Sequence, residues 1–415
     1  MWQRTWRFAP ALLLFVIVAA GVALLLWRIE KPSPPIAPLA ILRRVTFADL
    51  PGWKETDLGP AMKAFQRSCA VLNVKPAGAK MGVEGYAGTV ADWRGLCARV
   101  PQAGANAAAT RAFFESAFLP LEIRRFEGSE GPFTGYYEPE LAASRTAHGN
   151  YRTPIYGLPM TWVRADLGAF RQDLGGEHVE GCVHEHRFLP CPARAEIDAH
   201  GLADTPILLY ANDPISVFFL HIQGSGRARL DDGSMVRLAY AGQNGRPYTP
   251  VGRVLIARGL LDRKGMSMQA IRAWLEANPG EAQNVMNSDQ SYVFFSEKPM
   301  GDIELGSPGT EGVPLTPRGS LAVDPRIHPL GAPFYIVSTR PDPDPRRPDH
   351  PFRQLLIAQD TGGAIRGPAR GDVFWGYGQD AESIAGRMKA AGRMFVFVPR
   401  TVAARFRTSA ELHGP

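Results

Sequence analysis

The chain is organised around the stretch LLIAQDTGGAIRGPARGDVFWGYG, residues 355–378. Its apolar start at 355–358 predicts a buried strand that ends at Asp360, and a second apolar run that opens at Asp372 predicts another strand. The glycines between these runs permit a tight turn and a close approach of the backbone. Two carboxylates therefore stand at the ends of two short strands, where a rigid sheet can hold a proton donor in place. The alternative is that Asp360 makes an Asx-turn and that Asp372 caps a strand.

A third aspartate, Asp324, follows another apolar run in the last third of the chain. Three carboxylates that recur beside strand-like segments suggest the shared mouth of a β-barrel. Carboxylates that lie close together cannot all ionise without cost, so one of them would have a raised pKa and stay protonated near neutral pH. That is the condition for a general acid.

Length and composition are those of an ordinary globular protein. The chain has 415 residues, of which 45% are hydrophobic and 21% charged, so it can bury more than one core. Its 43 glycines and 36 prolines favour turns and short strands over long helices. The net charge of +6 is modest, and lysine-rich runs and nucleotide-binding glycine motifs are absent from the sequence. We therefore expect no nucleic acid partner and no cofactor.

The N-terminal segment predicts a membrane anchor. Residues 8–27 are uncharged and have arginines on both sides, and about 20 apolar residues suffice to cross a bilayer. A small-residue cleavage site does not follow closely, and the first cysteine is Cys69, which predicts no lipid attachment. We expect an uncleaved helix within residues 1–30, a proline-rich linker at 31–44 and a periplasmic remainder anchored to the inner membrane. A cleaved export signal is the alternative.

Four cysteines in an exported chain suggest two disulfides. Of the three pairings, we expect the local one, which joins Cys69 to Cys97 and Cys182 to Cys191. The second pair and the two histidines between its members would also fit a zinc knuckle. Their spacing is not a common one, however, and an oxidising compartment disfavours free thiolates. We therefore expect no metal.

The rest of the chain alternates between helical and strand-like patterns. Apolar runs at 132–139, 206–223, 291–296, 314–324, 333–337 and 393–398 predict strands, and residues 231–233 predict a hairpin turn. Amphipathic or capped segments predict helices at 60–72, 91–100, 106–118, 267–278 and 381–391.

Several motifs stand in a fixed order along the chain. They are FTGYYEPEL (133–141), FFLHIQGSGRARLDDG (218–233), the segment 287–295, GVPLTPRGSLAVDPRIHPLG (312–331), QDTGGAIRG (359–367), GDVFWGYG (371–378) and GRMFVFVP (392–399). Together they resemble the membrane-bound lytic transglycosylase A (MltA) family of murein-cleaving enzymes, whose C-terminal part is called the 3D domain after three aspartates. The resemblance covers about residues 45–400. In place of the lipid-attachment cysteine of well-known members, this chain has the predicted anchor helix.

The resemblance implies a mainly β fold with peripheral helices and a groove between two domains. A double-psi β-barrel would be built from residues 45–142 and 241–400, with the 3D domain at about 312–400. A smaller β-rich domain would be inserted at 143–240, and residues 401–415 would form a tail.

The resemblance also implies the reaction. It is non-hydrolytic cleavage of the MurNAc–GlcNAc β-1,4 bond of peptidoglycan glycan strands, which leaves a 1,6-anhydro-MurNAc end. By position in the motif, Asp372 is the catalytic acid and base, and Asp360 is its supporting carboxylate. Asp324 belongs to the substrate-binding candidates, with a structural role as the alternative. The other substrate-binding candidates are Thr134, Tyr137, Gln223, Ser225, Gly226, Thr361 and Gly363.

Other functions are open at this point. Asp360-Thr361-Gly362 matches the aspartic-peptidase tripeptide, but such a site needs two of these loops and the sequence has one. A hydrolase that uses water on the same glycan and a non-catalytic wall-binding barrel are nearer alternatives. Trp375 and Tyr377 are candidates for stacking on sugars, with core packing as the alternative for Trp375. Other cell-wall enzymes are candidate partners that the sequence does not identify.

Overall fold

The computed structural model describes most of the chain after the N-terminal segment. The described residues are 40–82, 85–100, 106–125, 128–174, 178–405 and 409–412. The expected anchor at 1–30 and the start of the expected linker lie outside them. Among the described residues, none of the helices combines the length and the apolar character that crossing a bilayer requires.

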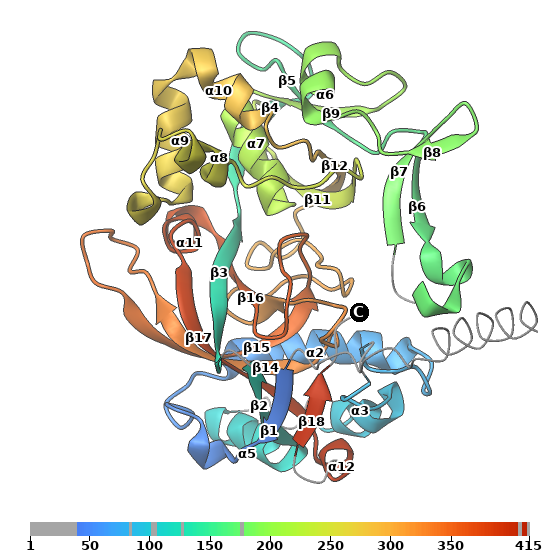
Figure 1. Ribbon diagram of the computed structural model, residues 1–415, viewed down its shortest axis with the longest axis vertical. Helices are drawn as coiled ribbons and strands as arrows, with labels where there is room; N and C mark the ends of the chain where they lie inside the picture. Colours follow the sequence, from blue (N-terminus) through green and yellow to red (C-terminus); the bar gives the residue numbers. More distant parts are fainter. Residues whose placement is uncertain are drawn as a thin grey trace, which may run out of the picture. The chain divides into compact units, whose positions relative to one another are not determined.

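Six strands close into a barrel (Figure 1). In order round the ring they are β14 (Pro333–Arg340), β15 (His350–Asp360), β13 (Ser320–Ala322), β16 (Gly371–Tyr377), β3 (Glu130–Glu138) and β17 (Lys389–Pro399), which returns to β14. The pairs β13–β15 and β16–β3 are parallel, and the other four pairs are antiparallel. Beyond β17 the sheet continues through β2 (Phe118–Arg125), β1 (Ala40–Arg44) and β18 (Ser409–Leu412). The predicted mainly β fold with a barrel is confirmed.

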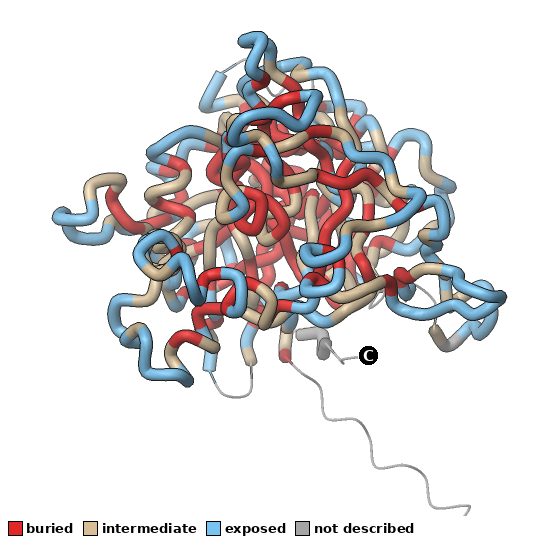
Figure 2. Tube along the Cα trace, turned by 90° about the horizontal axis from the view of Figure 1, so that it is seen from above, coloured by how far each residue is buried: buried red, intermediate tan, exposed pale blue. Residues whose placement is uncertain are grey.

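Three helices cover this sheet near the N-terminal strands: α2 (Gly59–Val74), α3 (Val90–Cys97) and α5 (Ala107–Ala117). Each begins where the sequence predicts. Pro60 stands in the first turn of α2, and the Asn106 side chain accepts a hydrogen bond from the Ala109 amide at the start of α5. Their apolar faces join the barrel interior in one large core, which includes the fully buried Phe65 and Trp93. Figure 2 shows this buried interior surrounded by exposed loops.

A second sheet of six strands takes its members from the middle of the chain. In order they are β12 (Val293–Pro299), β11 (Met235–Gln243), β10 (Gly226–Leu230), β4 (Glu140–Ser144), β9 (Ile207–Ala211) and β5 (Thr153–Tyr156). The turn between β10 and β11 is the predicted hairpin, with Gly233 at a φ of 85°. The second sheet includes β12, so it extends in sequence beyond residue 240, where the inserted domain is expected to end. The domain boundaries themselves stay a prediction.

The chain passes between the two sheets twice. Pro139 alone separates β3 from β4, and residues 300–319 lead back from β12 to β13. Next to the second sheet lie the helices α6 (Arg194–His200), α7 (Pro214–Gln223), α8 (Val251–Ala257), α9 (Met268–Ala277) and α10 (Pro279–Met286). A separate sheet consists of β6 (Trp162–Asp166), β7 (His178–His184) and β8 (Arg187–Leu189).

The predicted strand at 206–223 is wrong in its second half. Residues 207–211 form β9, but Pro214–Gln223 form the helix α7. Asp213 caps this helix, because its carboxylate accepts the amides of Ile215 and Ser216. The helix is buried against two cores at once, so its sequence is apolar all round and lacks a helical period.

The predicted helix at 381–391 is also too long. The helix α11 (Gly378–Ala385) ends at Gly386, and residues from Lys389 onward form β17. Lys389 pairs with Thr134 of β3, so closure of the barrel overrides the helical pattern here.

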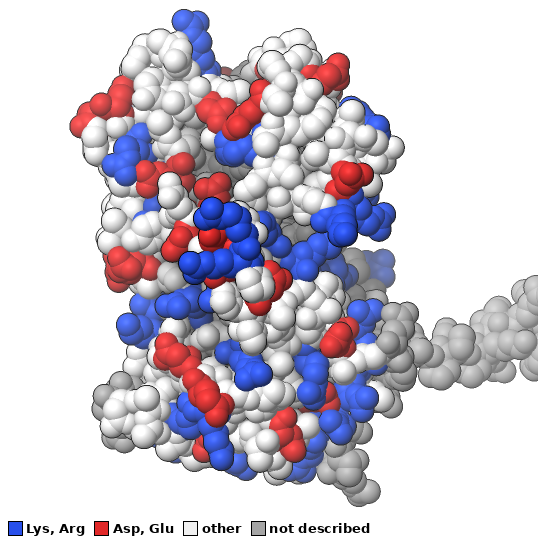
Figure 3. All heavy atoms as spheres, turned by 90° about the vertical axis from the view of Figure 1, so that its left-hand side faces the viewer, with Lys and Arg blue, Asp and Glu red and all other residues white. Residues whose placement is uncertain are grey.

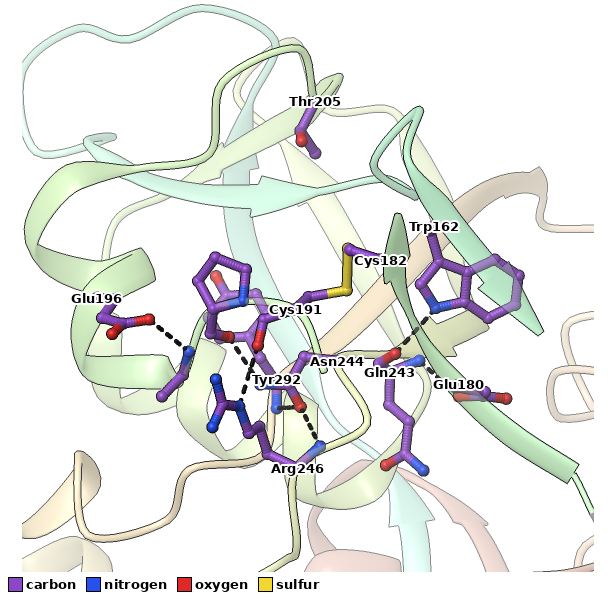
Figure 4. Close-up of a disulfide and its surroundings, with 12 residues drawn as sticks. Trp162, Glu180, Cys182, Cys191, Glu196, Thr205, Gln243, Asn244, Arg246 and Tyr292 are labelled. Atoms are coloured by element: carbon purple, nitrogen blue, oxygen red, sulfur yellow. Dashed lines mark hydrogen bonds between the residues drawn. A yellow bond between two sulfur atoms is a disulfide. The ribbon is translucent and has the colours of Figure 1, made fainter. Parts of the chain in front are cut away.

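Two disulfides join Cys69 to Cys97 and Cys182 to Cys191, which is the local pairing expected from the sequence. The second disulfide therefore occupies the thiolates of the alternative zinc knuckle. Figure 4 shows it beside Asn244, whose side chain donates to the carbonyls of Pro192 and Gln290 and accepts the amide of Tyr292. The disulfide ties the loop before α6 to β7 of the separate three-stranded sheet, and the Asn244 amide ties the same loop to the end of β11 in the second sheet.

Candidate active site

One line of paired residues across the barrel brings the two central aspartates near each other. Asp360 at the end of β15 pairs with Ala322 of β13, Ala322 also pairs with Asp372 of β16, and Asp372 pairs with Thr134 of β3. A bulge in β15 shifts the register, so that Asp360 rather than Gln359 stands opposite Ala322. Such bulges often redirect a side chain next to a functional site.

These residues lie on the outer face of the barrel. The flanking residues Leu321 and Val373 are fully buried in the main core, and successive residues of a strand point to opposite faces. Ala322 belongs to a separate small cluster with Tyr136 and Phe374. The two carboxyl groups therefore stand outside the barrel core and over a small apolar floor.

The Asp372 carboxyl group has one oxygen engaged and one free. The Thr134 hydroxyl donates to its Oδ1 at 2.6 Å, and Arg370 donates to the Thr134 oxygen at 2.8 Å. Among the described residues, none hydrogen-bonds Oδ2 of Asp372. An incoming ligand can therefore approach Oδ2.

The Asp360 carboxyl group has both oxygens engaged. The Tyr136 hydroxyl donates to Oδ2 at 2.8 Å. The Thr310 amide and hydroxyl donate to Oδ1 at 3.0 and 3.1 Å. The Thr310 hydroxyl also lies 2.8 Å from that of Thr361. Asp360 is thus held within the protein, whereas Asp372 has an open oxygen.

Both carboxyl groups have raised pKa values. Burial raises the pKa of Asp372, and although the Arg370 charge and the Thr134 hydrogen bond lower it in part, the charge of Asp360 raises it again. Burial also raises the pKa of Asp360, against the opposing effect of its hydrogen bonds from Thr361, Tyr136 and Thr310. A carboxyl group in this environment holds its proton at a higher pH than an exposed aspartate does.

Asp324 does not join these two residues at the site. Its side chain is fully buried and accepts two hydrogen bonds from the Arg326 guanidinium, one from the Arg326 amide and one from the Gly367 amide. Burial raises the pKa of Asp324, but these hydrogen bonds outweigh that effect and leave the pKa below its ordinary value. Gly367 has a φ of 103°, so the carboxylate holds a turn that only glycine adopts freely. This geometry agrees with the structural alternative for Asp324.

The remaining predicted positions form two groups. Thr361 lies beside Asp360, and Gly363 is exposed in the loop that follows. Gln223, at the end of α7, accepts the amide of Tyr137 at 3.1 Å. Ser225 and Gly226 are buried where α7 turns into β10, and a Cβ at Gly226 would lie 2.9 Å from the Pro139 carbonyl oxygen. This second group joins the second sheet to β3.

The two aromatic candidates are not open platforms. Trp375 is 7% exposed and packs on Phe352 with ring centroids 5.5 Å apart, which agrees with the core-packing alternative. The Arg227 guanidinium lies 3.5 Å from the ring centroid of Tyr377, and the Tyr377 hydroxyl donates to Glu304.

A buried carboxylate that sequence reasoning missed lies where the chain changes sheets. Glu138, at the end of β3, is fully buried and accepts hydrogen bonds from Arg227, from the Ser307 amide and from the Ser307 hydroxyl. Arg237 lies 3.7 Å away from it. The two arginines also donate to backbone carbonyls in the returning segment 303–306. One carboxylate therefore ties both crossings of the chain together.

Three residues next to the aspartates were also missed. Arg370 stands two positions before Asp372, and Tyr136 lies in the GYY motif, so proximity in the sequence would have pointed to both. Thr310 gave no local signal, because it reaches Asp360 from 50 positions away.

The surface charge is mixed. Figure 3 shows Lys and Arg side chains gathered across the middle of one face, with Asp and Glu side chains beside them. This face therefore has no extended surface of a single charge. Within the described part of the chain, no group of three His, Cys, Asp or Glu residues is placed to hold a metal ion.

Comparison with known proteins gives two family matches. Residues 132–296 match the MltA specific insert domain, and residues 319–398 match the 3D domain. The chain is 34% identical over 282 residues to the membrane-bound lytic murein transglycosylase A of Escherichia coli K12, and the match covers 66% of this chain and 69% of that protein.

Solved structures agree with these matches. A membrane-bound lytic murein transglycosylase from Agrobacterium tumefaciens superimposes with a TM-score of 0.76 at 34% identity, over 88% of this chain and 99% of that one. The structure of E. coli MltA with bound chitohexaose superimposes with a TM-score of 0.63 at 26% identity, over 89% of this chain and 96% of that one.

Proposed function

Because the chain belongs to the MltA family of lytic murein transglycosylases, we propose that it cleaves the MurNAc–GlcNAc β-1,4 bond of peptidoglycan without water, with Asp372 as its one acid and base. The observation that carries this proposal is the difference between the two aspartates. Asp360 has both oxygens bonded within the protein, and Asp372 has Oδ2 open.

The reaction needs a single group that first gives and then takes a proton. Protonated Asp372 donates its proton to the bridging O4 as the bond between C1 and O4 breaks. The resulting carboxylate then removes the proton of the C6 hydroxyl as O6 bonds to C1, which closes the 1,6-anhydro ring and returns the proton to Asp372. Proton transfer of this kind contributes about 10²–10⁴-fold to the rate.

Asp360 supports this cycle through its charge and burial. When it is ionised, it raises the pKa of Asp372 and helps that residue to keep its proton until the glycan is bound. Its own oxygens are occupied by Tyr136 and Thr310, so it has no open position from which to activate a water molecule. A hydrolase would need such a second carboxylate acting on water.

The peptidase alternative fails on distance. Aspartic peptidases share one proton between two carboxyl groups in direct contact. Here Ala322 of β13 stands between Asp360 and Asp372, so their backbones are two strand spacings apart, about 10 Å. Two carboxyl groups so placed do not form the shared-proton pair.

The substitution Asp372→Asn tests the proposal. Asparagine keeps the shape and accepts the Thr134 hydrogen bond but cannot donate an acidic proton, so lysis of murein sacculi should fall by at least about 10²-fold while the unfolding midpoint stays near the parental value. Mass spectrometry of the parental products should show glycan ends one water lighter than reducing ends. Parental lysis by the variant, or ordinary reducing ends from the parental enzyme, would refute the proposal.

The substrate and location follow the same reasoning. An MltA relative is solved with chitohexaose, a chain of β-1,4-linked sugars, which supports glycan strands as the ligand of this chain. The curated relatives are named membrane-bound, which supports a place in the cell envelope. Attachment through residues 1–30 stays a prediction.

A further inference from the structure

Arg370, Thr134 and Asp372 form a chain of hydrogen bonds with a fixed direction. Arg370 donates through one terminal nitrogen to the Thr134 oxygen at 2.8 Å and through the other to the Gly371 carbonyl at 2.6 Å. Thr134 Oγ1 lies 2.6 Å from Oδ1 of Asp372. A guanidinium group is always charged and has no acceptor, so Thr134 must accept from Arg370.

This direction determines where the Thr134 hydrogen goes. A hydroxyl group has one hydrogen, and the lone pairs of Thr134 face Arg370, so its hydrogen points to Oδ1 of Asp372. Oδ1 is then an acceptor whether Asp372 is protonated or ionised. The unprotonated carbonyl oxygen is the better acceptor, so the Thr134 hydrogen bond to Oδ1 favours the proton of neutral Asp372 on Oδ2, the oxygen that none of the described residues engages.

We propose that Arg370 is a positioning residue for the lytic reaction, which acts through Thr134 to place the catalytic proton on Oδ2 of Asp372. This inference rests on the proposed function. We call the hydrogen bonds from Arg370 through Thr134 to Asp372 the relay. Without the relay, the proton could occupy either carboxyl oxygen of Asp372, and the neutral acid would spend part of its time with the proton pointing into the protein.

The relay is rigidly built. Thr134 and Asp372 are directly paired across β3 and β16. Just before Arg370, the Ala369 carbonyl lies so close to β3 that a Cβ on Gly131 would be 1.7 Å from its oxygen. His328 contacts the Pro368 carbonyl at 2.6 Å. The backbone that carries Arg370 is therefore held from two sides.

Arg370 also acts on Asp372 through its charge. The guanidinium stabilises the carboxylate that forms after the first proton transfer, against the burial that favours the neutral acid. The other titratable groups around Asp372 are Asp360, whose charge raises the pKa of Asp372, and Tyr136 and Tyr248, whose pKa values Asp372 raises. The positive charge of Arg370 lowers the pKa of Asp372 and so opposes the effects of burial and of Asp360.

The test is the pH dependence of murein lysis by the full chain. Lysis requires protonated Asp372, so its rate falls as the pH rises past the pKa of that residue. In Arg370→Met the opposing cation is lost, so this fall should move upward by about one pH unit, and the rate at the plateau should drop about 10–100-fold because the proton is misplaced. In Arg370→Lys the charge remains, so the pH limb should stay near its parental position.

Variants at Thr134 separate the relay from the charge. Thr134→Ser keeps the hydroxyl and should keep most of the activity, whereas Thr134→Val should lose about as much plateau rate as Arg370→Met. In the Thr134→Val background, adding Arg370→Met should change the plateau rate by less than about threefold, because residues that act as one unit are not additive.

Two results would overturn the inference. One is a uniform loss of rate in Arg370→Met with the pH limb unmoved, which a merely structural role would give. The other is a full multiplicative loss in the double variant. Failure of the proposed function would show separately, as reducing ends in the parental products or as activity in Asp372→Asn.

Discussion

Replacing Glu311 with glutamine should stabilise the protein at pH 8 and not at pH 4. Glu311 is 8% exposed, and its Oε2 accepts the Ser68 hydroxyl at 2.6 Å. Its Oε1 is buried without a hydrogen-bond partner among the described residues. An ionised Glu311 would lose its hydration on burial, and the hydrogen bond from Ser68 does not replace it fully. The neutral form is therefore favoured.

The magnitude follows from the pKa. Burial raises the pKa of Glu311 from 4.5 to about 7, although the Ser68 hydrogen bond opposes the rise. Between these two values the folded state binds more protons than the unfolded state, so stability falls as the pH rises through this window and then levels off. A shift of about 2.5 units at about 1.4 kcal/mol each gives a loss of about 3 kcal/mol. Glutamine cannot ionise, so Glu311→Gln should remove this loss.

The assay is urea unfolding of the full chain at several pH values from 4 to 8. The free energy of unfolding of Glu311→Gln should exceed the parental value by up to about 3 kcal/mol at pH 8, and the difference should vanish near pH 4. Glu130→Gln is the matched control, because Glu130 is exposed on β3, and it should change little at either pH. A difference for Glu311→Gln that is the same at pH 4 and pH 8 would refute the reasoning.

Three further predictions concern single contacts. Glu138→Gln leaves two buried arginines without their carboxylate and should cost about 3–5 kcal/mol, measured by urea unfolding; an unchanged midpoint would contradict the role given to this carboxylate. Cys69→Ala combined with Cys97→Ala opens a loop with a sequence separation of 28 and should cost about 3–4 kcal/mol, and reduction should have no further effect at this site. Tyr136→Phe removes a donor to Asp360 and should cost about 1–3 kcal/mol, seen as a lower unfolding midpoint, with the pKa of that carboxyl, followed by NMR, rising further.

Much of the barrel could be predicted from the sequence, because its strands are apolar and bounded by Gly, Pro or Asp. The strand that ends at Asp360 and the strand that carries Asp372 are examples. The helix α7 could not be recognised by its pattern, because it is buried on all sides and local periodicity vanishes when a helix has no exposed face. The signal that remained was the Asp213–Pro214 start, which outweighs an apolar run.

In the candidate site, too, some residues could be predicted from the sequence and others could not. The two aspartates stand out because they border apolar runs, and Thr134 lies in a motif near a strand. The contacts that separate their roles depend on register. A bulge determines which residue of β15 pairs with Ala322. Thr310 lies in the long segment between β12 and β13, and its local sequence does not show that it contacts Asp360. Strand register and the placement of distant loops are decided by tertiary contacts, so the local sequence does not predict them.

The order in which the strands leave the ribosome has a consequence for the cell. All strands of the second sheet lie between residues 140 and 299, so that sheet can form while synthesis continues. By contrast, β3 must wait for β16 and β17, and Thr134 meets Asp372 across 238 positions, a slow, non-local encounter. Under the proposed role of Asp372, murein cleavage therefore requires the last strands of the chain, and we expect an incompletely synthesised chain to leave the wall of its own cell intact.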